Sequence, residues 1–296
     1  MGTTGVIPLI VIVGPTASGK SRLAMDIAKQ FGGEIICADS RTVYRGMDIG
    51  TAKPTAKDQQ EIPHHLLDVV EPGQQFNAAA FKRLANAAIR DIRRRGKLPV
   101  LVGGTGLYIN AVIFDYKFGP AADPKLRDVL SSKTIEELQE ICHKRNIEMP
   151  VNNLNKRHLI RAVELNGLIQ HKKSVIADVF VVGVAPNKEK LQKRIEDRAD
   201  FMFSQDILQE VHRLAKRFGW GSEAMKGNIY RIVRGVIEEG NSLDTAKEES
   251  VKSDIRLAKR QMTWFKANPY IHWGSTHHLK SEIKSFLRKY NMQPVQ

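Results

Sequence analysis

One stretch constrains the fold of this chain more than any other: Gly14-Pro15-Thr16-Ala17-Ser18-Gly19-Lys20-Ser21. It matches the phosphate-loop pattern, in which a glycine is followed by four residues and then by Gly-Lys-Ser or Gly-Lys-Thr. Val6 to Val13 reads as a buried parallel strand, and the residues after Ser21 have the apolar spacing of a helix. A loop placed between a strand and a helix N-terminus offers backbone N–H groups to phosphate oxygens. We therefore expect Gly14 to Ser21 to bind phosphate, with Lys20 on the outer phosphates and Ser21 on Mg²⁺.

Apolar runs that alternate with helical patterns predict the fold around this loop. After the first strand, the runs that read as strands are 34–38, 98–102, 175–184 and 271–273. Helical patterns separate them, which is typical of a doubly wound α/β fold with a parallel sheet. The segments 121–173 and 204–249 have no strand pattern. We therefore predict a phosphate-loop core at residues 1–121, 176–203 and 251–296, with helical additions at 122–175 and 204–250.

The charge of the chain points to a polyanionic partner. Lysine and arginine outnumber aspartate and glutamate by 46 to 32, which gives a formal net charge of +14. Such an excess favours nucleic acid or an anionic membrane surface. No apolar run in the sequence is long enough to span a bilayer, and no basic region precedes the first apolar run, so we expect neither a membrane segment nor a signal peptide. Cys37 and Cys142 form no metal-binding pattern and no disulfide framework, which fits a reducing cytoplasm.

Asp39 is the most informative single residue outside the phosphate loop. It follows the second predicted strand, and the carboxyl ends of parallel strands face the ligand crevice in this class of fold. Two chemical roles fit this place, namely holding Mg²⁺ through water and acting as a base toward a substrate. Asp39 followed by Ser40 is also a common way to cap a turn. A second glycine-rich turn, 103–108, follows the third predicted strand and is a candidate wall of the same crevice.

Several stretches together make a family resemblance visible. In chain order they are 14–21, 38–40, 44–54, 65–68, 102–108, 155–164, 194–198 and 258–265. The most specific are Asp48-Ile49-Gly50-Thr51-Ala52-Lys53-Pro54 and Lys259-Arg260-Gln261-Met262-Thr263-Trp264-Phe265. The set closely resembles the bacterial tRNA dimethylallyltransferase family, also called tRNA isopentenyltransferases, over nearly the whole chain.

The resemblance implies a reaction and its partners. Members of the family transfer a dimethylallyl group from dimethylallyl diphosphate to N6 of adenine 37, next to the tRNA anticodon, which yields N6-dimethylallyladenosine and diphosphate. The phosphate loop then holds a prenyl diphosphate together with Mg²⁺, and no nucleotide is hydrolysed. The anticodon stem-loop of tRNA would account for the positive charge. We expect a cytoplasmic monomer with no membrane partner.

The resemblance also implies roles for individual residues. Asp39 matches the residue that bonds N6 and acts as base, Thr105 a residue that lines the reaction channel, and Arg198 the arginine on the pyrophosphate. The implied tRNA contacts are Asp39, Ser40, Arg41, Thr42, Arg127, Arg157, His158, Leu159, Ile160 and Arg161. Many family members have glutamine where Thr42 stands, so this base contact departs from the family pattern. Lys259 and Arg260 lie on a basic helix and are candidates for either a solvated face or RNA contact.

Three alternatives compete with this interpretation. An adenylate isopentenyltransferase would use free AMP, but a mononucleotide needs no strongly basic surface. A small-molecule kinase would place ATP in the same loop, but this leaves the 48–54 stretch and the basic helix unexplained. A non-catalytic RNA-binding protein would have no need of Lys20, Ser21, Asp39 and Arg198 together.

Overall fold

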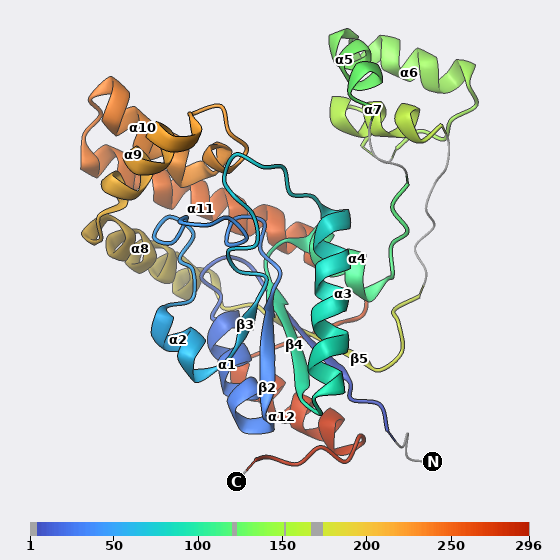
Figure 1. Ribbon diagram of the computed structural model, residues 1–296, viewed down its shortest axis with the longest axis vertical. Helices are drawn as coiled ribbons and strands as arrows, with labels where there is room; N and C mark the ends of the chain where they lie inside the picture. The colour runs from blue at the N-terminus through green and yellow to red at the C-terminus, as the bar shows by residue number, and fades with distance from the viewer. Residues whose placement is uncertain (1–4, 120–122, 151, 167–173, 296) are drawn as a thin grey trace. The chain divides into compact units, whose positions relative to one another are not determined.

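The computed structural model describes residues 5–119, 123–150, 152–166 and 174–295 (Figure 1). The chain divides into two compact units. The main unit comprises Met1–Ile113 and Val175–Gln296, and the small unit is Phe114–Ser174. The predicted boundary at residue 122 lies outside the described residues.

A parallel sheet forms the centre of the main unit. Within the described ranges it has six strands in the order β3-β2-β4-β1-β5-β6. They are β1 (Leu9–Val13), β2 (Gly33–Cys37), β3 (His64–His65), β4 (Leu98–Gly103), β5 (Val179–Val184) and β6 (Ile271–Gly274). Every residue of β1, β2 and β4 is buried, as expected for strands that are covered on both faces. The predicted doubly wound parallel fold is confirmed, and β3 is a short strand that the apolar pattern did not reveal.

Helices cover both faces of this sheet (Figure 1). The helices of the main unit are α1 (Lys20–Phe31), α2 (Ala56–Glu61), α3 (Ala78–Arg94), α4 (Gly106–Ile113), α8 (Lys188–Ser204), α9 (Ile207–Phe218), α10 (Asn228–Glu239), α11 (Leu243–Lys266) and α12 (Thr276–Arg288), with a short 3₁₀ helix at Ala224–Lys226. Helices α1 and α12 share one apolar core with the strands, in which Leu23, Ile27 and Ile283 are fully buried. Helix α3 packs on β2 and β4, and α4 packs between α3 and α11.

The segment 204–250 belongs to the main unit. Its helices α9 and α10 share an apolar core with the chain that follows β2, in which Val43, Met47, Val211 and Val233 are fully buried. This helical segment therefore packs on the loops at the carboxyl end of the sheet.

The small unit is helical. It contains α5 (Pro124–Ser132), α6 (Ile135–Lys144) and α7 (Lys156–Leu165), which pack around Leu130, Leu138, Cys142 and Leu159. Asp123 caps α5 and Thr134 forms a capping box with Glu137 at the start of α6, so both helix starts are specified locally.

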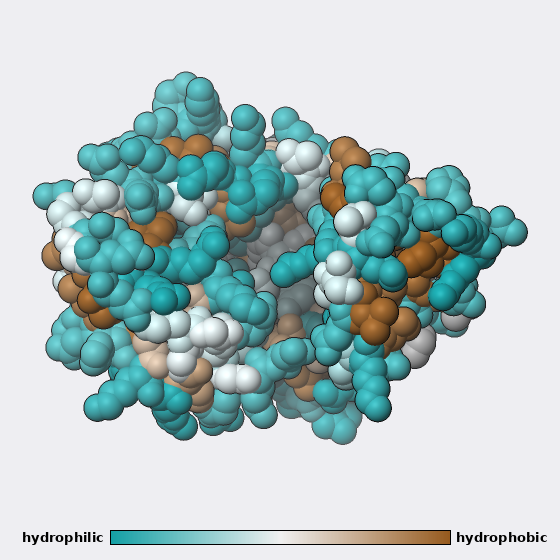
Figure 2. Space-filling model, turned by 90° about the horizontal axis from the view of Figure 1, so that it is seen from above, coloured by the Kyte–Doolittle hydropathy of each residue, from teal (hydrophilic) through white to brown (hydrophobic). Residues whose placement is uncertain are grey.

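The polar character of the molecular surface agrees with the composition of the chain. Figure 2 shows a surface that is mostly hydrophilic on the face in view. None of the helices in the described part of the chain has the length and apolar character needed to cross a membrane.

Candidate active site

A deep cavity opens at the carboxyl ends of β1, β2 and β4. Its volume is about 1070 Å³. The residues that line it include the phosphate loop from Thr16 to Ser21, the 39–42 segment, the 50–55 segment, Gly103 to Thr105, Arg194, Arg198, Asp254, Arg260 and Gln261. The crevice predicted from the strand and loop order is therefore present, and it brings together segments from every part of the main unit.

The phosphate loop has the backbone shape that anion binding requires. Gly19, with φ of 93°, precedes the first residue of α1, and this left-handed conformation explains the glycine. The Lys20 ammonium lies inside the cavity and donates to the Pro15 carbonyl over 3.1 Å. Burial lowers the pKa of Lys20 to about 8; the Asp39 carboxylate opposes this shift and Arg198 adds to it. The buried Ser18 hydroxyl has no hydrogen-bond partner among the described residues, so it is available to a ligand.

Two arginines of α8 lie on the same side of the phosphate loop, because residues four apart share a helix face. Arg194 donates to the Ser18 carbonyl over 2.7 Å. Arg198 donates to the Thr16 hydroxyl and, over 3.3 Å, to the Thr51 carbonyl. Its Nε is buried and lacks a hydrogen-bond partner in the described part of the chain. With Lys20, these guanidinium groups make this end of the cavity strongly positive.

Asp254 faces Arg198 from α11. The nearest nitrogen and oxygen of this ion pair are 3.8 Å apart, a long separation. Burial raises the pKa of the Asp254 carboxyl, and the Arg198 charge partly opposes this. Arg198 is therefore loosely paired on one side and can turn its remaining donors toward an anion.

The Asp39 segment also lines the cavity. Asp39 Oδ1 accepts from the backbone N–H groups of Arg41 and Thr42, at 2.7 and 3.3 Å. The Ser40 N–H donates to the Thr105 hydroxyl over 3.1 Å, which joins this segment to the second glycine-rich turn. Asp39 therefore caps a turn, as one sequence interpretation expected, and it also lines the cavity. Its role as a base stays a prediction.

Thr42 and Arg41 hold different places in this segment. The Thr42 hydroxyl is buried and has no hydrogen-bond partner within the described ranges, and its residue lines the cavity. Arg41 donates to the Glu223 carbonyl over 2.9 Å, so its guanidinium fastens the segment to the chain before α10.

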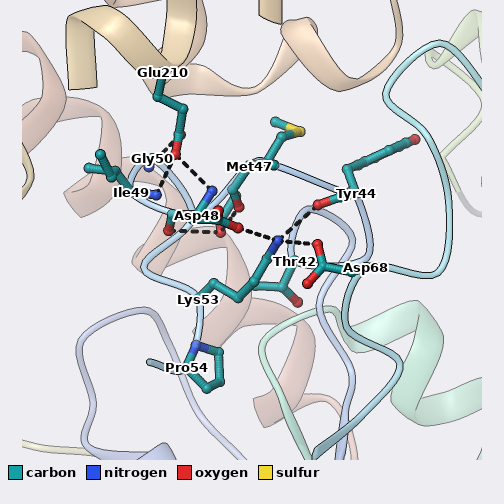
Figure 3. Close-up of polar contacts among 12 residues, drawn as sticks. Thr42, Tyr44, Met47, Asp48, Ile49, Gly50, Lys53, Pro54, Asp68 and Glu210 are labelled. Atoms are coloured by element: carbon teal, nitrogen blue, oxygen red, sulfur yellow. Dashed lines mark hydrogen bonds and ion pairs between the residues drawn. The ribbon is translucent and has the colours of Figure 1, made fainter. Parts of the chain in front are cut away.

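Lys53 fixes the 48–54 loop from inside. Its side chain is 4% exposed, and its ammonium donates to Asp48 and Asp68 at 2.6 Å each and to the Tyr44 carbonyl at 3.0 Å (Figure 3). The most specific stretch of the sequence is thus a rigid wall of the cavity. Its lysine has a structural place rather than a catalytic one.

Gln261 is a site residue to which sequence reasoning gave no role. Its side-chain oxygen accepts from the Thr16 N–H at 2.8 Å, and its amide nitrogen donates to the Gly104 carbonyl at 3.0 Å. One residue of α11 thus joins the two glycine-rich loops. Trp264, one turn later, packs so closely on Gly106 that a Cβ there would lie 2.1 Å from the indole. The only signal in the sequence was the 258–265 stretch itself.

Two more candidates for RNA contact lie on α11. Lys259 and Arg260 are both exposed, and Arg260 also lines the cavity. Phe265, which follows Trp264, is buried in the core.

The candidates for RNA contact in the small unit divide into two groups. Arg157 and His158 are exposed at the start of α7. Leu159 and Ile160 are 0% and 7% exposed, because this side of α7 faces the apolar core. Their side chains help to hold the unit together, and the expected contact of these two residues with RNA stays a prediction.

Arg127 and Arg161 share one buried carboxylate. Glu164 accepts from Arg127 at 2.7 and 2.8 Å and from Arg161 at 3.0 Å. Burial would raise the pKa of Glu164, but the two arginines outweigh it and lower the pKa. Arg127 therefore ties α5 to α7, whereas Arg161 and Glu164 are bonded within α7, and part of each arginine remains at the surface.

The donor set of the cavity fits a magnesium ion that arrives with phosphate. No group of three or more His, Cys, Asp or Glu side chains forms a metal cage in the described residues. Mg²⁺ commonly takes few protein ligands and completes its shell with phosphate oxygens and water. The exposed Ser21 hydroxyl, at the cavity wall and next to Lys20, is suited to be such a ligand.

Comparisons with known proteins agree with this geometry. The model of a family described as IPP transferase matches residues 42–268. The tRNA dimethylallyltransferase of Pelotomaculum thermopropionicum is 39% identical over 282 residues, covering 90% of this chain and 90% of that protein. The enzyme of the same name from Anoxybacillus flavithermus is 36% identical over 277 residues, covering 90% and 89%.

Solved structures give the same result. The tRNA isopentenylpyrophosphate transferase of Bacillus halodurans superimposes with a TM-score of 0.74 at 32% identity, covering 96% of this chain and 98% of that one. A eukaryotic dimethylallyltransferase acting on tRNA has a TM-score of 0.77 at 23% identity and covers 97% and 81%, which supports the fold alone.

Proposed function

The chain belongs to the IPP transferase family, and we propose that it transfers a dimethylallyl group from dimethylallyl diphosphate to tRNA. The finer proposal is that the acceptor is N6 of adenine 37, beside the anticodon. The observation that carries the proposal is the single cavity in which a phosphate loop, two arginines and Asp39 meet. That cavity offers both an anion site and a carboxylate.

The anion site suits a diphosphate leaving group. As the allylic C–O bond breaks, negative charge grows on the diphosphate and positive charge on the prenyl carbon. The N–H groups at the start of α1, the Lys20 ammonium and the free donors of Arg198 can stabilise that negative charge. Arg194 holds the Ser18 carbonyl, which keeps the loop in its binding shape.

We propose Mg²⁺ as the cofactor, with Ser21 as its protein ligand. Bound there, the ion would neutralise part of the diphosphate charge. The protein side of this proposal is the hydroxyl at the cavity wall, one residue after Lys20.

The acceptor adenine requires a general base that takes its proton, and it must be able to enter the cavity. The exocyclic amino group of adenine is a weak nucleophile and must lose a proton as it attacks. Asp39 lines the cavity with a carboxylate whose Oδ1 is fixed by two backbone N–H groups, so its orientation is set before substrate enters. A base in an anticodon loop can be extruded into such a cavity more easily than a base in a duplex. The buried Thr42 hydroxyl is a candidate contact for it.

One experiment tests the reaction and the position together. Purified protein is incubated with Mg²⁺ and radiolabelled dimethylallyl diphosphate, and with unmodified tRNA, the same tRNA carrying guanine at position 37, or AMP. We expect label in the first tRNA only. Label in both tRNAs would refute the position but keep tRNA prenylation. Label only in AMP, or no label in any acceptor, would refute the function.

A further inference from the structure

Glu210 of α9 is a buried carboxylate that no step of the reaction uses. The residue is 4% exposed. Its oxygens accept from three successive backbone N–H groups, those of Asp48 at 2.9 Å, Ile49 at 2.7 Å and Gly50 at 3.0 Å (Figure 3). The Tyr230 hydroxyl of α10 donates to it as well, over 2.8 Å. A side chain from the 204–250 segment thus holds the start of the 48–54 loop.

The chemistry of this contact requires a carboxylate. All four of these partners are donors, so a group with two acceptor oxygens satisfies them, whereas an amide would turn an NH₂ group against a backbone N–H. A buried carboxylate is expensive unless hydrogen bonds compensate it, and charge-assisted bonds are the stronger kind. The packing at this contact is also tight, because a Cβ on Gly50 would lie 2.9 Å from the Tyr230 hydroxyl.

The loop held in this way reaches the anion site. The residue after Gly50 is Thr51, and its carbonyl accepts from Arg198. Arg198 also bonds the Thr16 hydroxyl of the phosphate loop and keeps its Nε free of partners in the described residues. A displacement of residues 48–50 would therefore move the carbonyl that orients Arg198.

We propose that Glu210 is a positioning residue for the diphosphate site, which acts through the Asp48–Gly50 backbone and the Thr51 carbonyl on Arg198. The inference rests on the proposed function for the identity of the anion. It assigns a task in catalysis to a helix that lies outside the cavity wall. It also explains why a loop with the sequence Asp48-Ile49-Gly50-Thr51 lies against α9 and α10.

The test is a double-mutant cycle read out by pyrophosphate binding. Calorimetry with Mg²⁺ and inorganic pyrophosphate is run on the wild type, Glu210→Gln, Arg198→Ala and the double variant. We expect Glu210→Gln to weaken pyrophosphate binding about tenfold. This is the size of effect expected when one charged hydrogen-bond donor, here the Arg198 guanidinium, is displaced. In the Arg198→Ala background the same change should weaken binding less than about twofold, because its effect passes through Arg198. Glu238→Gln, an exposed glutamate of α10 paired with Arg234, is the matched control and should bind as wild type does.

Two outcomes of the cycle would decide against the inference. Equal losses in both backgrounds would show that Glu210 acts on general stability, and an unchanged affinity would show that it has no role in the site. Should Glu210→Gln melt well below the wild type, the cycle is run with Gly50→Ala, which leaves the carboxylate intact and shifts the same loop. Pyrophosphate binding can be measured without tRNA. If the cycle gave the expected result but the protein transferred no prenyl group, only the proposed function would be refuted. Absence of pyrophosphate binding by the wild type would refute both.

Discussion

The ammonium group of Lys20 should make the proposed binding of a diphosphate depend on pH. Its pKa is lowered to about 8 by burial, with Asp39 opposing and Arg198 assisting. Below pH 8 the lysine is charged in the free protein, and an anion binds without proton uptake. Above pH 8 the free lysine is neutral, but a bound diphosphate favours the charged form, so binding takes up a proton. Affinity should then fall with rising pH, approaching tenfold per pH unit.

Calorimetry with pyrophosphate between pH 7 and 9.5 measures this slope. Lys20→Arg is the matched control, because an arginine stays charged throughout the range and should give a flat profile. A slope of the same size in both proteins would assign the titration to a group other than Lys20.

Asp39 caps a turn and is proposed to act as a base, and a pair of substitutions can separate these two roles. Asparagine keeps an oxygen that can accept from Arg41 and Thr42 but cannot take a proton from N6, whereas alanine loses both. We expect Asp39→Asn to lower kcat at least ~100-fold while the affinity for tRNA and the melting temperature stay unchanged. Asp39→Ala should lose kcat equally and also lower the melting temperature. An active Asp39→Asn enzyme would leave Asp39 with the capping function alone.

At the scale of single helices and strands, local sequence patterns predicted the elements whose formation depends on neighbouring residues in the chain. The run Leu9–Val13 and the apolar face of α1 are continuous in sequence, so they showed both the buried strand and the helix that frame the phosphate loop. The crevice followed from the rule that parallel strands end at one edge. These predictions needed no knowledge of contacts between distant residues.

The contacts that complete the site join residues far apart in the chain, and sequence patterns do not report such pairs. Glu210 is 160 residues from Gly50, and Gln261 is 245 residues from Thr16. The helix periodicity of α9 predicts that residue 210 is buried. It does not predict that a charged side chain there would accept hydrogen bonds from the backbone of another segment. Leu159 and Ile160 are candidates for RNA contact on the family resemblance alone, and the local spacing of α7 turns their side chains inward.

Helix α11 should act on the diphosphate site through Gln261. Gln261→Glu keeps an acceptor for the Thr16 N–H, but it places a carboxylate against the Gly104 carbonyl and adds negative charge near the anion. We expect the KM for dimethylallyl diphosphate to rise at least ~10-fold. Gln261→Met, which is neutral and similar in size, should raise it less. Steady-state kinetics at saturating tRNA measures both.

The control for this prediction lies on the same helix. Thr263 is exposed, and its hydroxyl bonds only its own helix at Lys259 as far as the described contacts go. Thr263→Ala should therefore leave KM unchanged. Equal KM values for the Glu and Met variants would mean that the lost hydrogen bonds, and not the added charge, govern the effect.

At the scale of the whole molecule, the net charge of +14 predicts that electrostatic attraction contributes to tRNA binding. Cations that neutralise phosphates release counterions, so affinity should fall steeply with salt. Not every basic residue contributes to this surface, however. In the small unit, Arg127 is half exposed but pairs with the buried Glu164 carboxylate, whereas Arg157 is an exposed cation at the start of α7.

Replacing each of these two arginines should therefore give different results. Arg157→Ala removes an exposed cation, so we expect weaker tRNA binding, a salt slope that is smaller by about one, and an unchanged melting temperature. Arg127→Ala breaks the bidentate pair with Glu164, whose side chain is 2% exposed, and leaves that buried carboxylate with one arginine fewer. We expect this variant to melt earlier, with a loss on the order of 1 kcal/mol because Arg127 is itself half exposed. Filter binding of tRNA at several salt concentrations, paired with thermal denaturation, checks both. If Arg127→Ala changed only the salt slope, Glu164 would have other compensation and Arg127 would belong to the RNA surface.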